Sequence, residues 1–192
     1  MKKDFGAKPY IYPMPVLIIA TYNDDETANA MNAAWGGVCD YKKISIIIDK
    51  SHKTTENILK RKAFTVSIAD EQHITEADYL GIVSGNETKN KVEKAGLHCI
   101  KSKFVDAPLI EEFPLTLECR LISYDEQTER AIGEVINTAI SKIPDDADLV
   151  ITHVELTGTA KAAQPNKQHL SISNYLKAPE YDELVERFKN EL

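Results

Sequence analysis

Short apolar runs, each closed by turn residues, are the feature that most constrains how this chain folds. Residues 16–22 form one run, which an Asn-Asp-Asp turn follows, and residues 44–49 and 64–69 form two more that are rich in β-branched side chains. Runs of this length and composition are typical of β-strands. No regular alternation of strands with helices follows, which argues against the parallel sheet of a Rossmann fold.

The second half adds a predicted β-hairpin and a few helices. Residues 115–124 and 131–139 are its predicted strands, joined by a polar turn at 125–129, and residues 148–155 are a further strand candidate. Short helices are predicted at 56–62, 75–82 and 88–95. The pattern therefore favours a fold that is mainly β with inserted helices, arranged as a mostly antiparallel barrel.

Length and composition bound the class of protein. With 192 residues, of which 43% are hydrophobic, the chain suits a single domain over residues 1–192. Its net charge is -7 and it has no basic cluster, which argues against a nucleic-acid partner. Because no run resembles a signal peptide or a membrane span, we expect a cytoplasmic protein without a membrane contact.

Common catalytic and metal-binding motifs are missing from the sequence. The three cysteines and five histidines are dispersed, without a C-x-x-C pair or an H-E-x-x-H arrangement, so we expect no metal site. There is also no G-x-G-x-x-G, Walker loop or G-x-S-x-G. We therefore assign no catalytic residue.

A cluster of hydroxyl and basic residues stands between the second predicted strand and the first predicted helix. Its members are Lys50, Ser51, His52, Lys53, Thr54 and Thr55. Free backbone N–H groups, the positive end of a helix dipole, hydroxyls and ammonium groups here suit a bound phosphate. Ser and Thr also favour helix starts for local reasons, so an ordinary N-cap is the alternative.

The segment 29–37 is unusually rich in small residues and contains the single tryptophan, Trp35. Small side chains let a ligand or another backbone approach closely, and strand packing alone is the alternative explanation. The chain ends differently. Residues 160–173 are polar, and from Pro179 apolar residues recur at helical spacing, which predicts an amphipathic helix that packs on its own barrel or on a partner subunit.

Several motifs occur in one colinear order over roughly residues 9–140. They are Pro13-Met14-Pro15 with the run to Thr21, Asn29 to Trp35, Asp49 to Thr54, Ser84-Gly85-x5-Lys91-x4-Gly96-Leu97, Ala107 to Ile110, Leu117-Glu118-Cys119 and Ile132 to Val135. This set resembles the flavin reductase-like and flavoredoxin family, which has an FMN-binding split barrel. Each motif alone is weak, whereas their order is specific.

The resemblance implies an antiparallel, Greek-key-like split β-barrel that is usually a homodimer and binds FMN without a covalent link. In the family, the segment matching Asn32, Ala33, Ala34 and Trp35 runs along the isoalloxazine, and the segment matching Asp49, Lys50, Ser51, His52, Lys53 and Thr54 holds the phosphate. Trp35 packs near the ring or serves as a core or interface aromatic. Ser84 and Lys91 match residues near the cofactor, with Lys89 as the alternative to Lys91.

Two departures from the family pattern qualify this picture. His52 stands where relatives often carry arginine, so we expect the affinity for the FMN phosphate to depend on the charge of the imidazole. After about Ser141 the usual family ending is not recognisable, and residues 160–192 are particular to this branch.

Three functions follow from the resemblance. The first is an NAD(P)H-dependent flavin reductase, in which FMN is a cofactor or an exchanging substrate and NADH or NADPH is the donor. The second is an FMN electron carrier with a redox partner protein and no nicotinamide site. The third is a flavin-binding module without turnover. A split barrel has no dinucleotide fingerprint that separates them.

Overall fold

The computed structural model describes residues 4, 6–8, 11 and 14–141, and all structural statements concern these residues. The predicted strand at 148–155, the polar segment at 160–173 and the terminal helix lie outside them.

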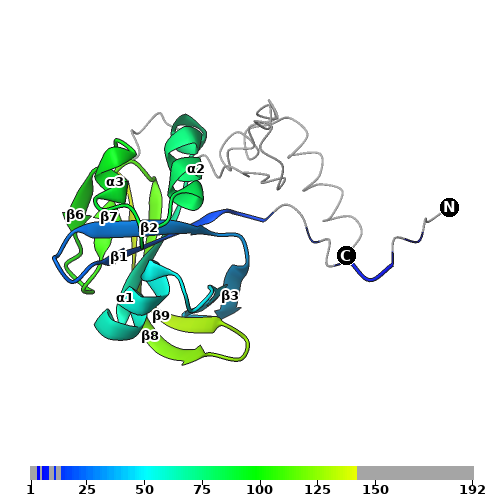
Figure 1. Ribbon diagram of the computed structural model, residues 1–192. Coiled ribbons are helices and arrows are strands. Elements are labelled where there is room, and N and C mark those ends of the chain that lie inside the picture. The colour runs from blue at the N-terminus through cyan, green and yellow to red at the C-terminus, as the bar shows by residue number, and fades with distance from the viewer. Residues whose placement is uncertain (1–3, 5, 9–10, 12–13, 142–192) are drawn as a thin grey trace, which may run out of the picture.

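A curled antiparallel sheet is the main element of the fold (Figure 1). Its strand order is β2-β1-β5-β8-β9-β4-β3, and β6 and β7 form a separate two-stranded sheet. The strands are β1 Leu17–Tyr22, β2 Ala28–Ala33, β3 Gly36–Asp40, β4 Lys43–Ile47, β5 Ala63–Ile68, β6 Cys99–Lys101, β7 Pro108–Ile110, β8 Leu115–Asp125 and β9 Arg130–Ile140. β4 pairs with β9, and β5 pairs with β1 and β8. The expected antiparallel barrel with inserted helices is therefore confirmed.

The helices differ from the predicted ones at their ends. They are α1 Lys53–Arg61, η1 Glu71–His73, α2 Ile74–Ile82 and α3 Lys91–Lys94. α1 begins three residues before the predicted start, because the backbone already turns at His52 and the Thr55 hydroxyl donates to the Asp49 carbonyl at 2.7 Å. α3 is shorter than predicted because Asn90 has a left-handed backbone with φ 53°. Within the described ranges, no helix is long and apolar enough to cross a membrane.

β1 is buried on both faces and separates two apolar clusters. Ile18 and Ala20 pack on one side with residues of α2 and α3, including Leu80 and Val92. Leu17 and Ile19, which alternate with them along β1, pack on the other side. Their neighbours there include Ile46, Ile58, Phe64 and Cys119. Figure 1 shows α2 and α3 on one side of β1 and β2, and α1 on the other. Burial of such side chains contributes about 1.5–3 kcal/mol each, so β1 anchors both layers.

The C-terminal end of α1 is fastened to the turn between β1 and β2. Arg61 binds Glu26 at 2.7 Å and Asp106 at 3.0 Å, and its guanidinium lies 6.0 Å from the centre of the Tyr22 ring. Asn57 donates to the hydroxyl of Thr21 at 3.1 Å. These contacts fix the direction of α1, and therefore the place to which its N-terminus points.

We expect Ile18→Ala to lower the free energy of unfolding by about 2–4 kcal/mol. The Ile18 side chain is fully buried, so its truncation leaves a cavity beside α2. The control is Ile82→Ala, since Ile82 is 74% exposed and its loss should change stability by less than about 0.5 kcal/mol. Urea unfolding of both variants measures the difference. Equal stability of the two variants would contradict the role given to β1.

Candidate functional site

The N-terminus of α1 presents unpaired backbone donors. The first helical bond runs from the Glu56 N–H to the His52 carbonyl, and the His52 side chain does not cap the helix. The N–H groups of Lys53, Thr54 and Thr55 have no acceptor in the described part of the chain. Such groups, together with the helix dipole, form a site suited to an anion.

Asp49 shapes the turn that leads into α1. Its Oδ1 accepts a hydrogen bond from the Ser51 N–H at 2.7 Å, and its carbonyl accepts one from the His52 N–H at 3.2 Å. The hydrogen bonds from Ser51 hold the pKa of Asp49 below its usual value. A carboxylate that is ionised in this way offers an anion no donor, so the geometry gives Asp49 a shaping role.

The hydroxyl of Thr54 is oriented by a residue from the edge strand β2. The Asn29 side-chain amide donates to Thr54 Oγ1 at 2.8 Å, and both residues are 2% exposed. Because the Thr54 oxygen accepts here, its own hydrogen is left to donate to another group.

The turn at residues 84–86 lies against the same segment. Asn86 donates from its side-chain amide to the Ser51 carbonyl at 2.9 Å, and the Ser84 hydroxyl accepts from the Asn86 N–H at 3.2 Å. A Cβ atom at Gly85 would lie 2.3 Å from Asn29 Oδ1 and 3.3 Å from Lys53 Cβ. The turn therefore touches both β2 and the start of α1, and only glycine fits at its centre.

The basic residues of the segment are placed differently from one another. Lys50 and His52 are exposed. The Lys53 ammonium lies 2.9 Å from Glu56 Oε1, one turn along α1. An anion at the helix start would compete with this carboxylate for Lys53. The Lys53 side chain is 21% exposed, whereas that of Glu56 is 57% exposed. Because water hydrates the Glu56 carboxylate, the ion pair with Lys53 is weak.

The Lys91 side chain is directed to the end of α2. It is 3% exposed, and its ammonium donates to the carbonyls of Leu80 at 3.0 Å and Val83 at 2.7 Å. Burial lowers the pKa of Lys91 to about 8. The observed contacts thus belong to the C-terminal end of α2, and a direct contact of Lys91 with a cofactor stays a prediction. The alternative residue, Lys89, is exposed.

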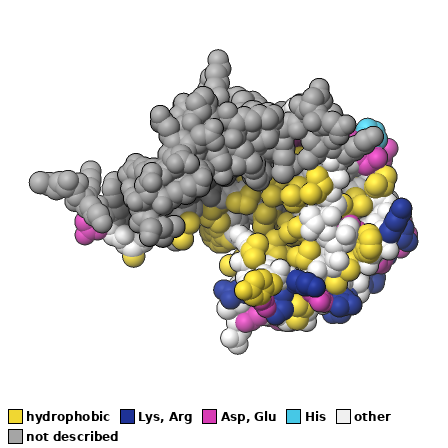
Figure 2. Space-filling model, turned by 180° about the vertical axis from the view of Figure 1, so that it is seen from behind, with side chains coloured by type: hydrophobic (Ala, Val, Ile, Leu, Met, Phe, Trp, Pro, Cys, Tyr) yellow, Lys and Arg dark blue, Asp and Glu magenta, His cyan; other side chains and the backbone are white. Residues whose placement is uncertain are grey.

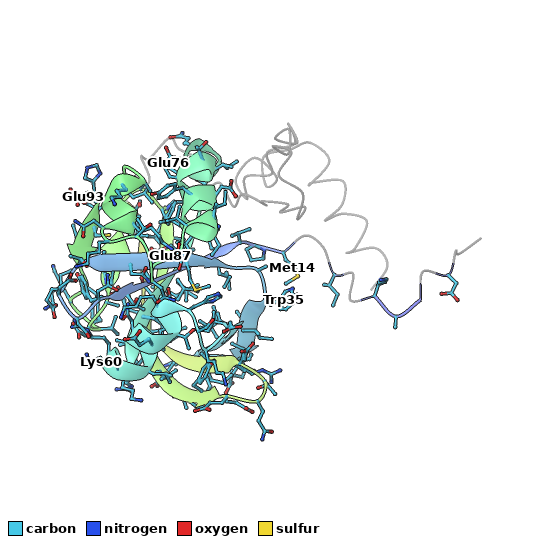
Figure 3. The ribbon with its side chains drawn as sticks, viewed as in Figure 1. Met14, Trp35, Lys60, Glu76, Glu87 and Glu93 are labelled. Carbon is cyan, nitrogen blue, oxygen red and sulfur yellow. The ribbon has the colours of Figure 1, made fainter. Side chains whose placement is uncertain are left out.

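The predicted ring-binding segment spans the end of β2 and the turn into β3. Ala33 is buried, whereas Ala34 is exposed. Trp35 is 67% exposed, which excludes a core role (Figure 3). The Trp35 carbonyl accepts from the Ile47 N–H at 2.8 Å, two residues before Asp49. The ring-binding and phosphate-binding segments predicted from the sequence therefore meet at the end of β4.

Asn32 carries an unpaired acceptor in this region. Its Oδ1 is buried and has no hydrogen-bond partner among the described residues. Its Nδ2 lies against α2, since a Cβ atom at Gly81 would be 2.5 Å from it. A buried acceptor without a donor is destabilising by about 1–3 kcal/mol, so the site is better satisfied when a donor binds there.

The structure thus joins residues that the sequence patterns treated separately and adds three that they missed. Asn29, Gly85 and Asn86 were not among the predicted site residues, and their contacts link positions 25 to 56 residues apart. The small-residue pattern at 29–37 and the Ser-Gly-Asn turn were the available signals. Among the described residues, no group of three or more His, Cys, Asp or Glu side chains is placed to hold a metal ion.

Comparison with known proteins decides the family. Residues 10–160 match the model of the flavin reductase like domain. The chain belongs to this family. The match covers the whole described barrel from β1 to β9, including all the residues that surround the N-terminus of α1. The family resemblance inferred from the order of the sequence motifs is therefore confirmed, as is the split-barrel fold.

Solved structures agree with this assignment. The flavoredoxin of Desulfovibrio vulgaris (Miyazaki F) is 37% identical, with a TM-score of 0.70 over 76% of this chain and 81% of that one. The flavoredoxin of Methanosarcina acetivorans is 26% identical, with a TM-score of 0.64 over 74% and 76% of the two chains. An FMN-binding domain of a flavin reductases-like enzyme from Shewanella baltica OS155, at 23% identity and a TM-score of 0.63 over 69% and 72%, supports the fold alone.

A second kind of relative matches only a short stretch. Over 57 residues, which are 30% of this chain, it is 53% identical to the mannitol-specific EIICB component of the PTS system of Halalkalibacterium halodurans. A stretch of 55 residues is 56% identical to the corresponding component of Bacillus subtilis (strain 168). The chain spans 12% of the length of each of these relatives.

We expect Lys91 to make the stability of the protein rise with pH above about 8. Its pKa is about 8 in the folded protein, against an ordinary value of 10.5 for lysine, so between these two values the unfolded chain binds more protons at this residue. Unfolding is then disfavoured increasingly as pH rises through this window. Urea unfolding at pH 7.5 and 10 should show the wild type gaining stability relative to Lys91→Met. A constant difference between the two proteins would contradict this burial effect.

Proposed function

We propose that this protein binds FMN non-covalently and acts as an oxidoreductase that takes reducing equivalents from NAD(P)H. The carrying observation is the meeting of three segments at the N-terminus of α1, where N–H groups are unpaired and the Thr54 hydroxyl, which accepts from Asn29, keeps its own hydrogen to donate. Membership of the flavin reductase-like family supports a flavin as the ligand.

The residues present fit a flavin phosphate. The N–H groups of Lys53, Thr54 and Thr55 supply neutral donors at the positive end of a helix of nine residues. Lys50 and His52 add exposed cationic or titratable groups beside them. The nearby carboxylate of Asp49 accepts from the Ser51 N–H, so its role is to shape the turn rather than to contact the phosphate.

The other end of the site fits a planar ring with N–H groups. The unpaired Asn32 Oδ1 requires a donor, which an isoalloxazine edge offers. The exposed indole of Trp35 and the small side chain of Ala34 leave room for the ring beside the turn between β2 and β3. FMN, when bound, would supply the hydride and electron chemistry, while these residues position it and set the polarity around it.

An FMN electron carrier is the second candidate. The observation that favours it is the 37% identity to a flavoredoxin over most of both chains. Such a carrier would exchange electrons with a redox partner protein and would need no nicotinamide site. Both candidates use the same flavin site and differ only in the donor.

Anaerobic reduction separates the two candidates. Purified full-length protein loaded with FMN should lose its visible flavin absorbance within seconds of adding NADH or NADPH if it is a reductase. The control omits the protein, because free FMN reacts slowly with the nucleotide. Bleaching that requires a reduced protein donor would identify a carrier instead. Protein that fails to retain FMN at all would contradict both candidates.

We expect Gly85→Ala to weaken FMN binding about tenfold or more, because the added Cβ atom would collide with Asn29 Oδ1 and separate the turn from α1. The control is Gly96→Ala, because a Cβ atom there meets no heavy atom within 4 Å but strains a backbone with φ +79°, so it tests whether strain at a glycine outside the site weakens binding. Fluorescence titration with FMN measures both affinities. Wild-type affinity in Gly85→Ala would show that the turn does not shape the site.

We also propose that the protein is a homodimer through the exposed apolar residues around β3. Trp35, Val38 and Tyr41 are 67%, 83% and 104% exposed and follow one another along β3 and its two flanking turns. Figure 2 shows that hydrophobic side chains also gather on the face opposite to the view of Figure 1. Exposed apolar residues on an edge strand favour pairing with another chain.

We expect the double substitution Val38→Lys and Tyr41→Lys to give a monomer, because it places charge on both exposed positions. Light scattering after size-exclusion chromatography measures the mass. Ile82→Lys is the control, since Ile82 is also largely exposed, at 74%, but lies at the end of α2. A wild-type protein with the mass of one chain would contradict the dimer.

A further inference from the structure

Lys91 closes the segment that carries the turn at residues 84–86. Val83 stands at the start of this segment and Lys91 follows its end, and the Lys91 ammonium donates to the Val83 carbonyl at 2.7 Å. A second bond, of 3.0 Å, runs to the Leu80 carbonyl in the last turn of α2. One side chain thus ties the first residue of α3 to the end of α2.

The closed segment makes the contacts that reach α1. Asn86 holds the Ser51 carbonyl at 2.9 Å, and Gly85 lies against Asn29 and Lys53. Ser51 stands two residues before α1, and it is held by Asn86 at its carbonyl and by Asp49 Oδ1 at its N–H, so the position of the turn helps to place the chain that enters the helix. Displacement of the end of α2 would be passed on to that carbonyl.

We propose that Lys91 is a positioning residue for phosphate binding, which acts by fixing the end of α2 so that Asn86 and Gly85 hold the start of α1 in its binding conformation. The proposal rests on the proposed FMN site and assigns Lys91 a role through the protein rather than through contact with the cofactor.

The surroundings of Lys91 support this role. The last carbonyls of a helix lack donors within the helix, and a cation at that end also interacts favourably with the helix dipole. The titratable residues on the packed elements are Glu76, Asp78 and Tyr79 of α2 and Glu93 and Lys94 of α3, and β2 has none. Among the described residues, none of these side chains is paired with Lys91. The two carbonyls are therefore the partners that keep this buried ammonium in place.

Titrations with FMN and with riboflavin test the proposal on the full chain. The variants are Lys91→Met, which keeps the aliphatic stem but removes the ammonium, Asn86→Ala and the double variant. Lys94→Met, at an exposed position of α3, is the matched control. We expect Lys91→Met to weaken FMN binding about tenfold, roughly the loss of one charge-assisted hydrogen bond. Riboflavin, which lacks the phosphate, should be affected much less.

Two further results distinguish positioning from contact. Because Lys91 acts through Asn86, the double variant should have about the same FMN affinity as the single variant that binds FMN more weakly. The fold-losses of affinity in the two single variants should not multiply in the double variant. Wild-type FMN affinity should also fall several-fold between about pH 7 and 9.5, as the ammonium loses its proton and its hydrogen bonds weaken. This fall should be absent from Asn86→Ala, a readout that does not require Lys91→Met to fold.

Each contrary outcome is specific. Equal losses of FMN and riboflavin binding in Lys91→Met would mean that Lys91 touches the ring or ribityl chain. Multiplying effects of Lys91→Met and Asn86→Ala would mean that Lys91 acts on the phosphate independently of the turn. Unchanged FMN binding in Lys91→Met would overturn the positioning role alone. Failure of the wild type to bind FMN would overturn the proposed function, and this inference with it.

Discussion

The two-sided burial of β1 is the constraint on which the rest of the structure depends. Because Ile18 packs toward α2 while Ile19 packs toward α1, neither layer can shift without exposing apolar surface on the other side. β2 is paired with β1 along its whole length, from Leu17 with Ala33 to Tyr22 with Ala28. The edge strand is thereby held between two helical layers, and the ends of both layers meet beside it.

The candidate site is a consequence of that arrangement. α1 approaches β2 with its N-terminus and is held in direction by Arg61 at its other end. α2 approaches with its C-terminus, and the turn that follows reaches Ser51. Asn29 of β2 contacts both Thr54 and Gly85, so one strand residue joins the two helical layers. The unpaired N–H groups of α1 lie at this junction, and the unpaired Asn32 Oδ1 belongs to the same strand as Asn29. These are the groups that the proposed phosphate and planar ring would pair with.

Much of the fold was predictable because its signals are local. The β-branched runs located β1, β4 and β5, and the polar turn located the β8–β9 hairpin, since strand composition and turn chemistry act over a few residues. Helix ends were predicted less well. The early start of α1 depends on a hydrogen bond from Thr55 to Asp49, and the late start of α3 depends on the left-handed Asn90, neither of which changes the apolar periodicity. β3 and β6 were missed because they are short and exposed or half-buried, and β7 because it has only three residues, although Pro108 and Ile110 are buried.

The sequence by itself determined the class of fold, the family and the segment that supplies the helix-terminal donors, because these follow from composition, turn residues and the order of motifs along the chain. Only the tertiary structure decided which side chains surround that segment. Asn29 and Asn86 reach it from 25 and 35 residues away, and Lys91, which carries the charge expected of a ligand, is turned toward the end of α2. The physical reason is that a polar side chain takes the partner that folding brings within hydrogen-bond distance, and strand order, rather than sequence separation, sets that distance.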